Sequence, residues 1–124
     1  MPDPESPSSY PVTEATAQFR WTEALHIAFN RIASIAPGKT SSAIKFAHEI
    51  TAYMKEAYKI EVEILLPVGG NPQRIAWSTR YKDLAAFDAV SSKILSDKHY
   101  WEVVGKGADN FLAGSMHDSI WRVV

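Results

Sequence analysis

The stretch IEVEILLPVGGNPQRIAWSTRY, which spans Ile60–Tyr81, decides the fold of this 124-residue chain. Apolar side chains recur at every second position on both sides of Gly69-Gly70-Asn71-Pro72, as in two strands joined by a hairpin turn. A turn that is symmetric about its central residues places both apolar rows on the same side of the hairpin. The pairs in that register are Ile60 with Tyr81, Val62 with Thr79, Ile64 with Trp77 and Leu66 with Ile75.

The other face of the hairpin carries polar side chains in the same register. It sets Glu61 opposite Arg80 and Glu63 opposite Ser78, and a slip of one residue would destroy both matches together with the apolar rows. Pro67 cannot donate a hydrogen bond to a strand ladder, so we expect the first strand of the hairpin at an edge of the sheet.

The segment before the hairpin predicts a strand and a helix. Residues Trp21–Ile32 alternate between apolar and other side chains, and Pro37-Gly38 ends this strand. Thr40, Ser41 or Ser42 then caps a helix. The predicted buried stripe of that helix is Ile44, Ala47, Ile50, Thr51, Met54 and Tyr58.

The segment after the hairpin predicts an interrupted helix and a last strand. Asp83 is a suitable N-cap, and Ser96-Asp97 predicts a break followed by a new cap. Gly105 and Gly107 end the helix, and Ser115–Val124 is the predicted last strand. The predicted buried stripe of this helix is Leu84, Phe87, Val90, Ile94 and Leu95.

The predicted order of elements is β-α-β-β-α-β. Two helices on one side of a four-stranded antiparallel sheet make an α+β fold of ferredoxin-like topology, and they leave the other sheet face bare. We expect residues 21–124 to form this single domain. Residues 1–20, which are acidic and rich in proline, are expected to form an extended tail anchored by Tyr10 and Val12.

The composition excludes several classes of function. The net charge of −1 and the scattered Lys and Arg residues predict no nucleic-acid partner and no membrane partner. Because the chain has no cysteine, disulfides and thiolate chemistry are excluded. The first residues, Met1–Glu5, carry neither the basic nor the apolar region of a secretory signal, so we expect a cytoplasmic location.

The strand-to-helix passage Ile75–Phe87 and the segment Leu95–Tyr100 resemble the dimeric α+β barrel superfamily, which includes NIPSNAP proteins and antibiotic-biosynthesis-monooxygenase-like proteins. The second segment is similar to the short small-Asp-x-x-aromatic break that those proteins carry in their second helix. The resemblance covers about residues 22–124 and implies a homodimer whose two sheets pack face to face as a shared barrel. Members include cofactor-free monooxygenases, heme-degrading enzymes, isomerases and proteins without known activity, so the fold is a weak guide to the reaction.

The bare sheet face holds the candidate catalytic residues, His26 and Asn30 on the first predicted strand and Arg80 on the third. A histidine near carboxylates can act as a general base, while Asn30 or Arg80 stabilises a developing oxyanion. The simpler interpretation is a structural ion pair between Glu61 and Arg80 beside a hydrogen-bonded histidine. The candidate ligand-binding residues are Glu61, Glu63, Ser78, Trp77 and Tyr81, of which the last two are also typical core aromatics.

The parity of the last strand stays open. Either Asp118 and Arg122 or His117 and Trp121 join the bare face.

No metal and no cofactor is predicted. His26, Glu61 and Glu63 share a face but lack an ordered metal-ligand spacing. The resemblance also implies a test for heme, because heme-degrading members use an Asn on the first strand with a Trp and a His on the second helix. Asn30 matches the first, whereas Val90 and Val104 stand near the other two positions.

We therefore predict a small homodimeric α+β barrel protein that binds a small, partly apolar organic molecule, with its reaction unassigned. One alternative is a cofactor-independent monooxygenase or isomerase that acts on a small organic substrate. The other is a NIPSNAP-like protein-interaction module with a filled barrel, in which the N-terminal tail makes the contacts. Whether the protein is an enzyme stays open at this point.

Overall fold

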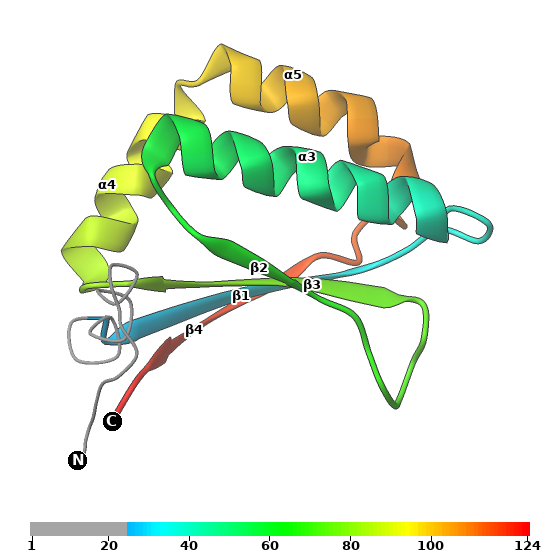
Figure 1. Ribbon diagram of the computed structural model, residues 1–124, viewed down its shortest axis with the longest axis horizontal. Coiled ribbons are helices and arrows are strands. Elements are labelled where there is room, and N and C mark those ends of the chain that lie inside the picture. Colours follow the sequence, from blue (N-terminus) through cyan, green and yellow to red (C-terminus); the bar gives the residue numbers. More distant parts are fainter. Residues whose placement is uncertain (1–24) are drawn as a thin grey trace, which may run out of the picture.

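The computed structural model describes residues 25–124 (Figure 1). The predicted order is confirmed, with the interrupted helix present as two helices, so that the topology is β-α-β-β-α-α-β. The elements are β1 (Ile27–Ser34), α3 (Thr40–Tyr58), β2 (Val62–Leu65), β3 (Arg74–Tyr81), α4 (Leu84–Leu95), α5 (Lys98–Gly107), the short 3-10 helix η2 (Ala108–Asn110) and β4 (His117–Arg122).

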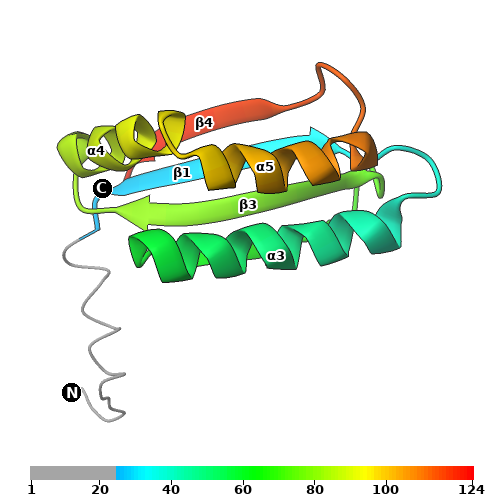
Figure 2. The same ribbon diagram turned by 90° about the horizontal axis from the view of Figure 1, so that it is seen from above.

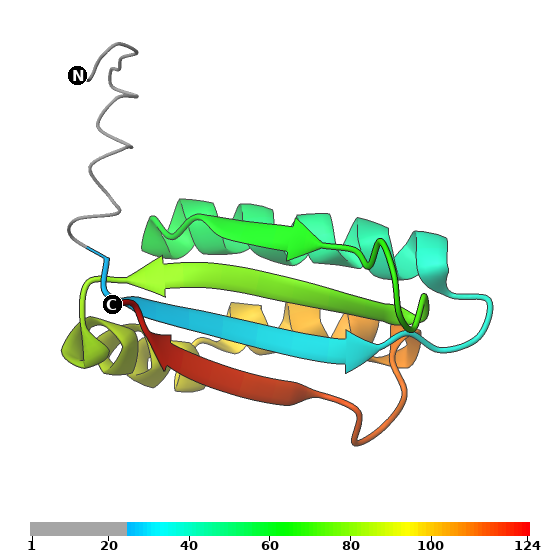
Figure 3. The same cartoon turned by 90° about the horizontal axis from the view of Figure 1, so that it is seen from below.

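The four strands form one antiparallel sheet in the order β2-β3-β1-β4. Helices α3, α4 and α5 lie on one face of this sheet (Figures 1 and 2). The other face, seen in Figure 3, carries no helix in the described part of the chain. The edge position of β2 confirms the expectation drawn from Pro67, which follows this strand by two residues.

The hairpin register is confirmed in the part that forms a ladder. Val62 lies opposite Thr79 and Glu63 lies opposite Ser78. Strand β2 begins only at Val62, however, and Glu61 forms an ion pair with Lys55 of α3 at 3.4 Å. The predicted pairing of Glu61 with Arg80 lies one residue beyond the ladder and stays a prediction, while Lys55 at the end of α3 is a further partner of this carboxylate.

The first strand is shifted toward the C-terminus relative to its prediction. It runs to Ser34 rather than to Ile32, because Ala33 and Ile35 continue the buried row at 0% and 2% exposure. The N–H of Ile35 also donates to the carbonyl of Gln73 at 2.6 Å. The predicted strand residues 21–24 and the predicted tail, residues 1–20, lie outside the described residues.

The start of α3 differs from its prediction as well. The N-cap is Lys39, which makes no side-chain capping bond, and Thr40 is already helical. The turn before it decides this position, because the Lys39 N–H donates to the carbonyl of Ala36 at 3.0 Å and Gly38 adopts a φ of 77°. The buried residues of α3 are Ala43, Phe46, Ala47, Ile50 and Met54.

The hydrophobic core lies between the sheet and the helices. Ile75 and Trp77 of β3 face it at 1% and 8% exposure, and Ala33 of β1 lies beside them at 0%. From α4, Phe87 contacts Phe29 and Tyr81, with ring centroids 5.3 Å apart in both pairs. This burial on a single face leaves the other face without a role in the core of the described domain.

Helix α5 packs tightly against α3 at Gly107. This glycine is buried, and a Cβ atom in its place would overlap the aromatic ring of Phe46. The ring of Phe46 also packs edge-on against Phe111, with centroids 5.7 Å apart, so it has little room to move. By contrast, no atom lies within 4 Å of a Cβ placed on Gly105 of the same helix.

We expect Gly107→Ala to destabilise the protein and Gly105→Ala to leave it unchanged or slightly more stable. Overpacking a filled core costs about 1–3 kcal/mol, whereas an alanine without steric conflict in a helix gains roughly 0.4–1 kcal/mol. Thermal and urea unfolding of both variants would measure the difference. Equal stability of the two variants would contradict the close packing of α5 on Phe46.

Asp97 lies between α4 and α5 and links this pair of helices to α3. As the N-cap of α5 it accepts a hydrogen bond from the N–H of Tyr100 at 3.1 Å. Its second carboxylate oxygen accepts from the hydroxyls of Tyr53 and Tyr58 of α3, each at 2.5 Å. These two hydroxyls lower the pKa of Asp97 to about 2, and burial together with Asp97 raises the pKa of Tyr58 to about 12. The predicted break and new cap at Ser96-Asp97 are confirmed.

The acid stability of the protein should depend on this carboxylate. Because the pKa of Asp97 is lower in the folded chain, its contribution is fully present above the ordinary value of 3.8 and is lost as the pH falls to about 2. We expect Asp97→Asn to lower the free energy of unfolding at neutral pH and to reduce its fall between those two pH values. Urea unfolding across this range measures both effects.

The matched control is Asp83→Asn, which makes the same change at the cap of α4, where the carboxylate accepts from the N–H of Ala86 at 2.8 Å. An identical pH dependence in wild type and Asp97→Asn would show that the tyrosine hydroxyls do not act on Asp97.

Candidate functional site

A row of polar side chains crosses the centre of the open sheet face. Glu63 of β2 lies opposite Ser78 of β3, and Ser78 lies opposite Asn30 of β1. Asn30 in turn lies opposite Ser119 of β4, so one residue from each strand stands in register. Directly opposed residues on neighbouring strands point to the same side of a sheet. The row therefore brings together three of the predicted site residues, Asn30, Glu63 and Ser78.

The rows on either side of it are more apolar. One consists of Leu65, Ala76, Ile32 and His117, and the other contains Arg80, Ala28 and Trp121. Trp121 is 62% exposed and Leu65 is 46% exposed, whereas the alanines and serines near the centre are half-buried. Trp121 and Leu65 thus stand on the edge strands, while the central strands present mainly small side chains to this face, with Ile32 and Arg80 as the larger ones.

The parity of the last strand follows from its pairing with β1. Ile32 lies opposite His117 and Ala28 lies opposite Trp121, so this pair belongs to the open face. Asp118 points to the helix side, where its two oxygens accept from the guanidinium of Arg31 at 2.7 and 2.9 Å. This hydrogen-bonded ion pair raises the pKa of Arg31 above its ordinary value. Of the two sets that the sequence left open, His117 and Trp121 are the correct one.

The structure places His26 just before β1, at the end of the sheet. It is exposed, its N–H donates to the carbonyl of Lys82 at 3.4 Å, and its own carbonyl accepts from the N–H of Val123 at 2.7 Å. Four residues of extended strand separate it from Asn30, a span of about 13 Å. His117 stands one row away from Asn30, a diagonal distance of roughly 7–8 Å. The histidine of the open face nearest to Asn30 is therefore His117 rather than His26.

Trp77 and Tyr81 lie on the helix side and not beside the polar row. Both are 8% exposed, and burial raises the pKa of the Tyr81 hydroxyl. The buried indole N–H of Trp77 has no hydrogen-bond partner among the described residues. Alternation along β3 separates these aromatic rings from Ser78 and Arg80, so a ligand on the open face would not reach them.

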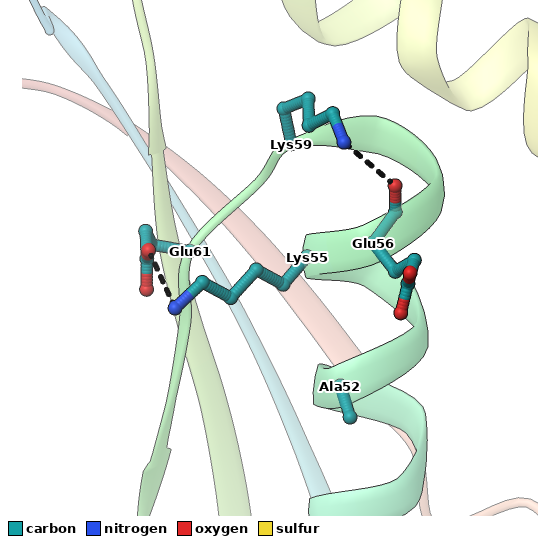
Figure 4. Close-up of a pocket in the computed structure, with 5 residues that line it drawn as sticks. All are labelled: Ala52, Lys55, Glu56, Lys59 and Glu61. Atoms are coloured by element: carbon teal, nitrogen blue, oxygen red, sulfur yellow. Dashed lines mark hydrogen bonds and ion pairs between the residues drawn. The ribbon is translucent and has the colours of Figure 1, made fainter.

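Two shallow depressions of the described surface lie beside the helices. One is a charged recess at the end of α3, lined by Ala52, Lys55, Glu56, Lys59 and Glu61 (Figure 4). Its ion pair between Lys55 and Glu61 is well exposed, with 69% and 80% of the side chains accessible. The other lies where α4 meets α5, beside Leu95 and Trp101. Neither recess contains a set of converging groups suited to catalysis.

The described residues include no cluster of three or more His, Cys, Asp or Glu side chains placed to hold a metal ion. Glu61 turns to Lys55, so it does not meet His26 and Glu63. Among residues 25–124, no helix is long and apolar enough to cross a membrane.

Comparison with known proteins finds the same fold in solved structures. A NIPSNAP family protein of unknown function from Agrobacterium tumefaciens matches with a TM-score of 0.67 and 11% identity, over 80% of this chain and 88% of that one. An uncharacterised NIPSNAP domain protein from Burkholderia xenovorans matches with a TM-score of 0.66 and 12% identity, over 77% and 91% of the two chains.

A third solved structure with this fold is a putative antibiotic biosynthesis monooxygenase from Nitrosomonas europaea. It has a TM-score of 0.61 and 20% identity, over 81% of this chain and 92% of that one. No protein-family model and no curated protein matches the sequence. The expected resemblance is thus confirmed at the level of the fold: the chain has the ferredoxin-like α+β fold of these NIPSNAP family and monooxygenase-like structures.

Proposed function

We propose that the protein is a homodimer whose two open sheet faces pack together and enclose a small, partly apolar organic molecule. The observation that carries this proposal is the composition of the open face. A polar row lies between two rows that are mostly apolar, on the one face that no helix covers in the described chain. A face exposed to water in a monomer is ordinarily polar throughout.

The sizes of the side chains support an internal cavity. Two sheets that pack face to face lie about 10 Å apart, and side chains normally fill that space. Here Ala28, Ala76, Ser78 and Ser119 occupy central positions of the face, while Trp121 and Leu65 stand toward its edges. Two such faces would meet at their rims and leave a hollow at the centre, with Asn30 and Ser78 available to orient a ligand.

Native mass spectrometry of the purified protein tests the assembly and the ligand together. We expect a dimer, and a bound molecule would appear as additional mass. Ile32→Lys places an ammonium group in the middle of the face and should weaken the dimer by at least about a hundredfold, because an unpaired buried charge costs several kcal/mol.

Ala52→Lys is the matched control, because Ala52 is exposed on α3, away from the open face. This variant should remain a dimer. A monomeric wild-type protein, or an Ile32→Lys variant that dimerises as tightly as the wild type, would contradict the proposed pairing.

The second candidate function is catalysis without metal or flavin, as a monooxygenase or isomerase. The arrangement of His117 one row from Asn30 favours it, because a general base and an oxyanion-stabilising amide would then face the same enclosed space. The fold shared with a putative antibiotic biosynthesis monooxygenase also supports it.

If the enclosed molecule is turned over, His117→Gln should reduce kcat by at least about a hundredfold and leave the dimer intact, since a general base typically contributes 10²–10⁴. His26→Gln is the matched control and should retain most of the activity. Single-turnover assays with the molecule found by mass spectrometry make the comparison. Loss of activity only in His26→Gln would reinstate the sequence-based assignment of His26 as the base.

A further inference from the structure

Strand β4 forms one edge of the sheet (Figure 3), and within residues 25–124 no strand pairs with its outer side. It is six residues long, none of them is buried, and it contains neither Pro nor Lys. The other edge strand, β2, is only four residues long and is soon followed by Pro67. Proteins protect free strand edges with short strands, prolines or lysines, because an unprotected edge pairs readily with another strand. Of the two edges, β4 is therefore the one suited to a further strand.

The hydrogen bonds to β1 show which backbone groups of β4 face outward. The N–H of Val123 donates to the carbonyl of His26 at 2.7 Å, so Val123 turns its N–H toward β1. Backbone groups of successive strand residues point alternately to the two sides of the strand. The residues that turn their N–H and C=O groups away from β1 are therefore Asp118, Ile120 and Arg122. Their side chains lie on the helix side of the sheet, since Arg122 is opposite the buried Ile27.

These outward-facing residues are self-complementary in a single antiparallel register. When Ile120 of two copies lie opposite each other, Asp118 of each copy lies opposite Arg122 of the other. A pairing centred on Asp118 or on Arg122 would place like charges opposite each other, which is destabilising. A pairing centred on Ser119 or on Trp121 would place a charged residue opposite Ile120. Only the register centred on Ile120 therefore matches both the charges and the apolar side chains.

Asp118 has acceptor sites left for this second partner. Its two oxygens accept from the guanidinium of Arg31 at 2.7 and 2.9 Å. A carboxylate offers about four lone-pair sites, so it accepts a further guanidinium without losing the first. In the register centred on Ile120, Asp118 stands between Arg31 of its own chain and the partner's Arg122.

We propose that the two subunits of the homodimer pair antiparallel along their β4 strands, with the two-fold axis at Ile120. This inference rests on the proposed homodimer, because two paired edge strands alone are only marginally stable. On the open-face side the same register sets Ser119 opposite the partner's Trp121. The polar row of each subunit, which runs from Asn30 to Ser119, then continues to an indole ring of the second subunit, so the partner completes the candidate site.

Single cysteines test this seam without background, because the chain has no cysteine of its own. Opposed residues in a hydrogen-bonded pair have Cα atoms about 5.5 Å apart, which a disulfide spans. Under mild oxidation we expect Ile120→Cys to form a disulfide-linked dimer at least about tenfold faster than Leu112→Cys, because opposed cysteines have a high effective concentration. Leu112→Cys is the matched control, since the two side chains are 47% and 49% exposed. Mass spectrometry without reductant measures the linked fraction.

Two further cysteines test the register. Neither Ser119→Cys nor Trp121→Cys should link to itself, because each residue is displaced by two positions from its own copy along the partner strand. An equimolar mixture of these two variants should form the mixed disulfide, because Ser119 of one subunit lies opposite Trp121 of the other.

A proline variant tests the backbone hydrogen bonds. Ile120→Pro removes an N–H that points away from β1, so it leaves the ladder between β1 and β4 intact. We expect it to weaken the dimer at least about tenfold more than Ile120→Ala, which shortens the same side chain and keeps the N–H.

A dimer in native mass spectra whose Ile120→Cys variant links no faster than Leu112→Cys would overturn the β4 seam and leave the pairing of the open faces standing. Linkage of Ser119→Cys or Trp121→Cys to itself would overturn the register centred on Ile120. A monomeric wild-type protein would contradict both the seam and the proposed homodimer.

Discussion

The pairing of β1 along both of its edges is the constraint on which the rest of the structure depends. Because β1 lies between β3 and β4, its register decides which face every residue of these strands occupies. Asn30 on the open face requires Ser78 and Ser119 to share that face, while Ala33 must point to the helices. A slip of one residue on the β3 side would move Trp77 out of the core and bury its polar neighbours. The candidate site and the core are thus two results of one register.

The helix layer depends on a second set of contacts, which direct α4 and α5 differently over the sheet. Asp97 lies where the chain changes direction between α4 and α5. Its carboxylate accepts hydrogen bonds from the hydroxyls of Tyr53 and Tyr58. At the far end of α5, Gly107 lets the helix approach Phe46 of α3. These contacts hold the helices against one side of the sheet, so the apolar side chains are buried on that side alone. The small and polar residues of the open face therefore serve no purpose in the core, and their pattern requires another explanation.

Local signals predicted much of this architecture. Alternation, the turn and the caps at Asp83 and Asp97 depend on residues close in sequence, and all were read correctly. Apart from the cap of α3, which a local turn at Ala36–Lys39 decides, the errors concern contacts between distant segments. The stripe assigned to α3 omitted Phe46, which is buried because a glycine of α5 accommodates its ring. The ion pair of Glu61 with Lys55 was not foreseen, because the lysine reaches the carboxylate from the end of α3.

The sequence by itself determined the order of the elements, the hairpin register and the presence of Asn30 and Ser78 on one face, because strand alternation is a property of the chain's own geometry. Only the tertiary structure decided that His117 and Trp121, rather than Asp118, face the same side. Strand β4 has an apolar residue on each of its faces, Ile120 on one and Trp121 on the other, so its own pattern favours neither. Its parity comes from hydrogen bonds to β1, a strand about ninety residues earlier in the sequence.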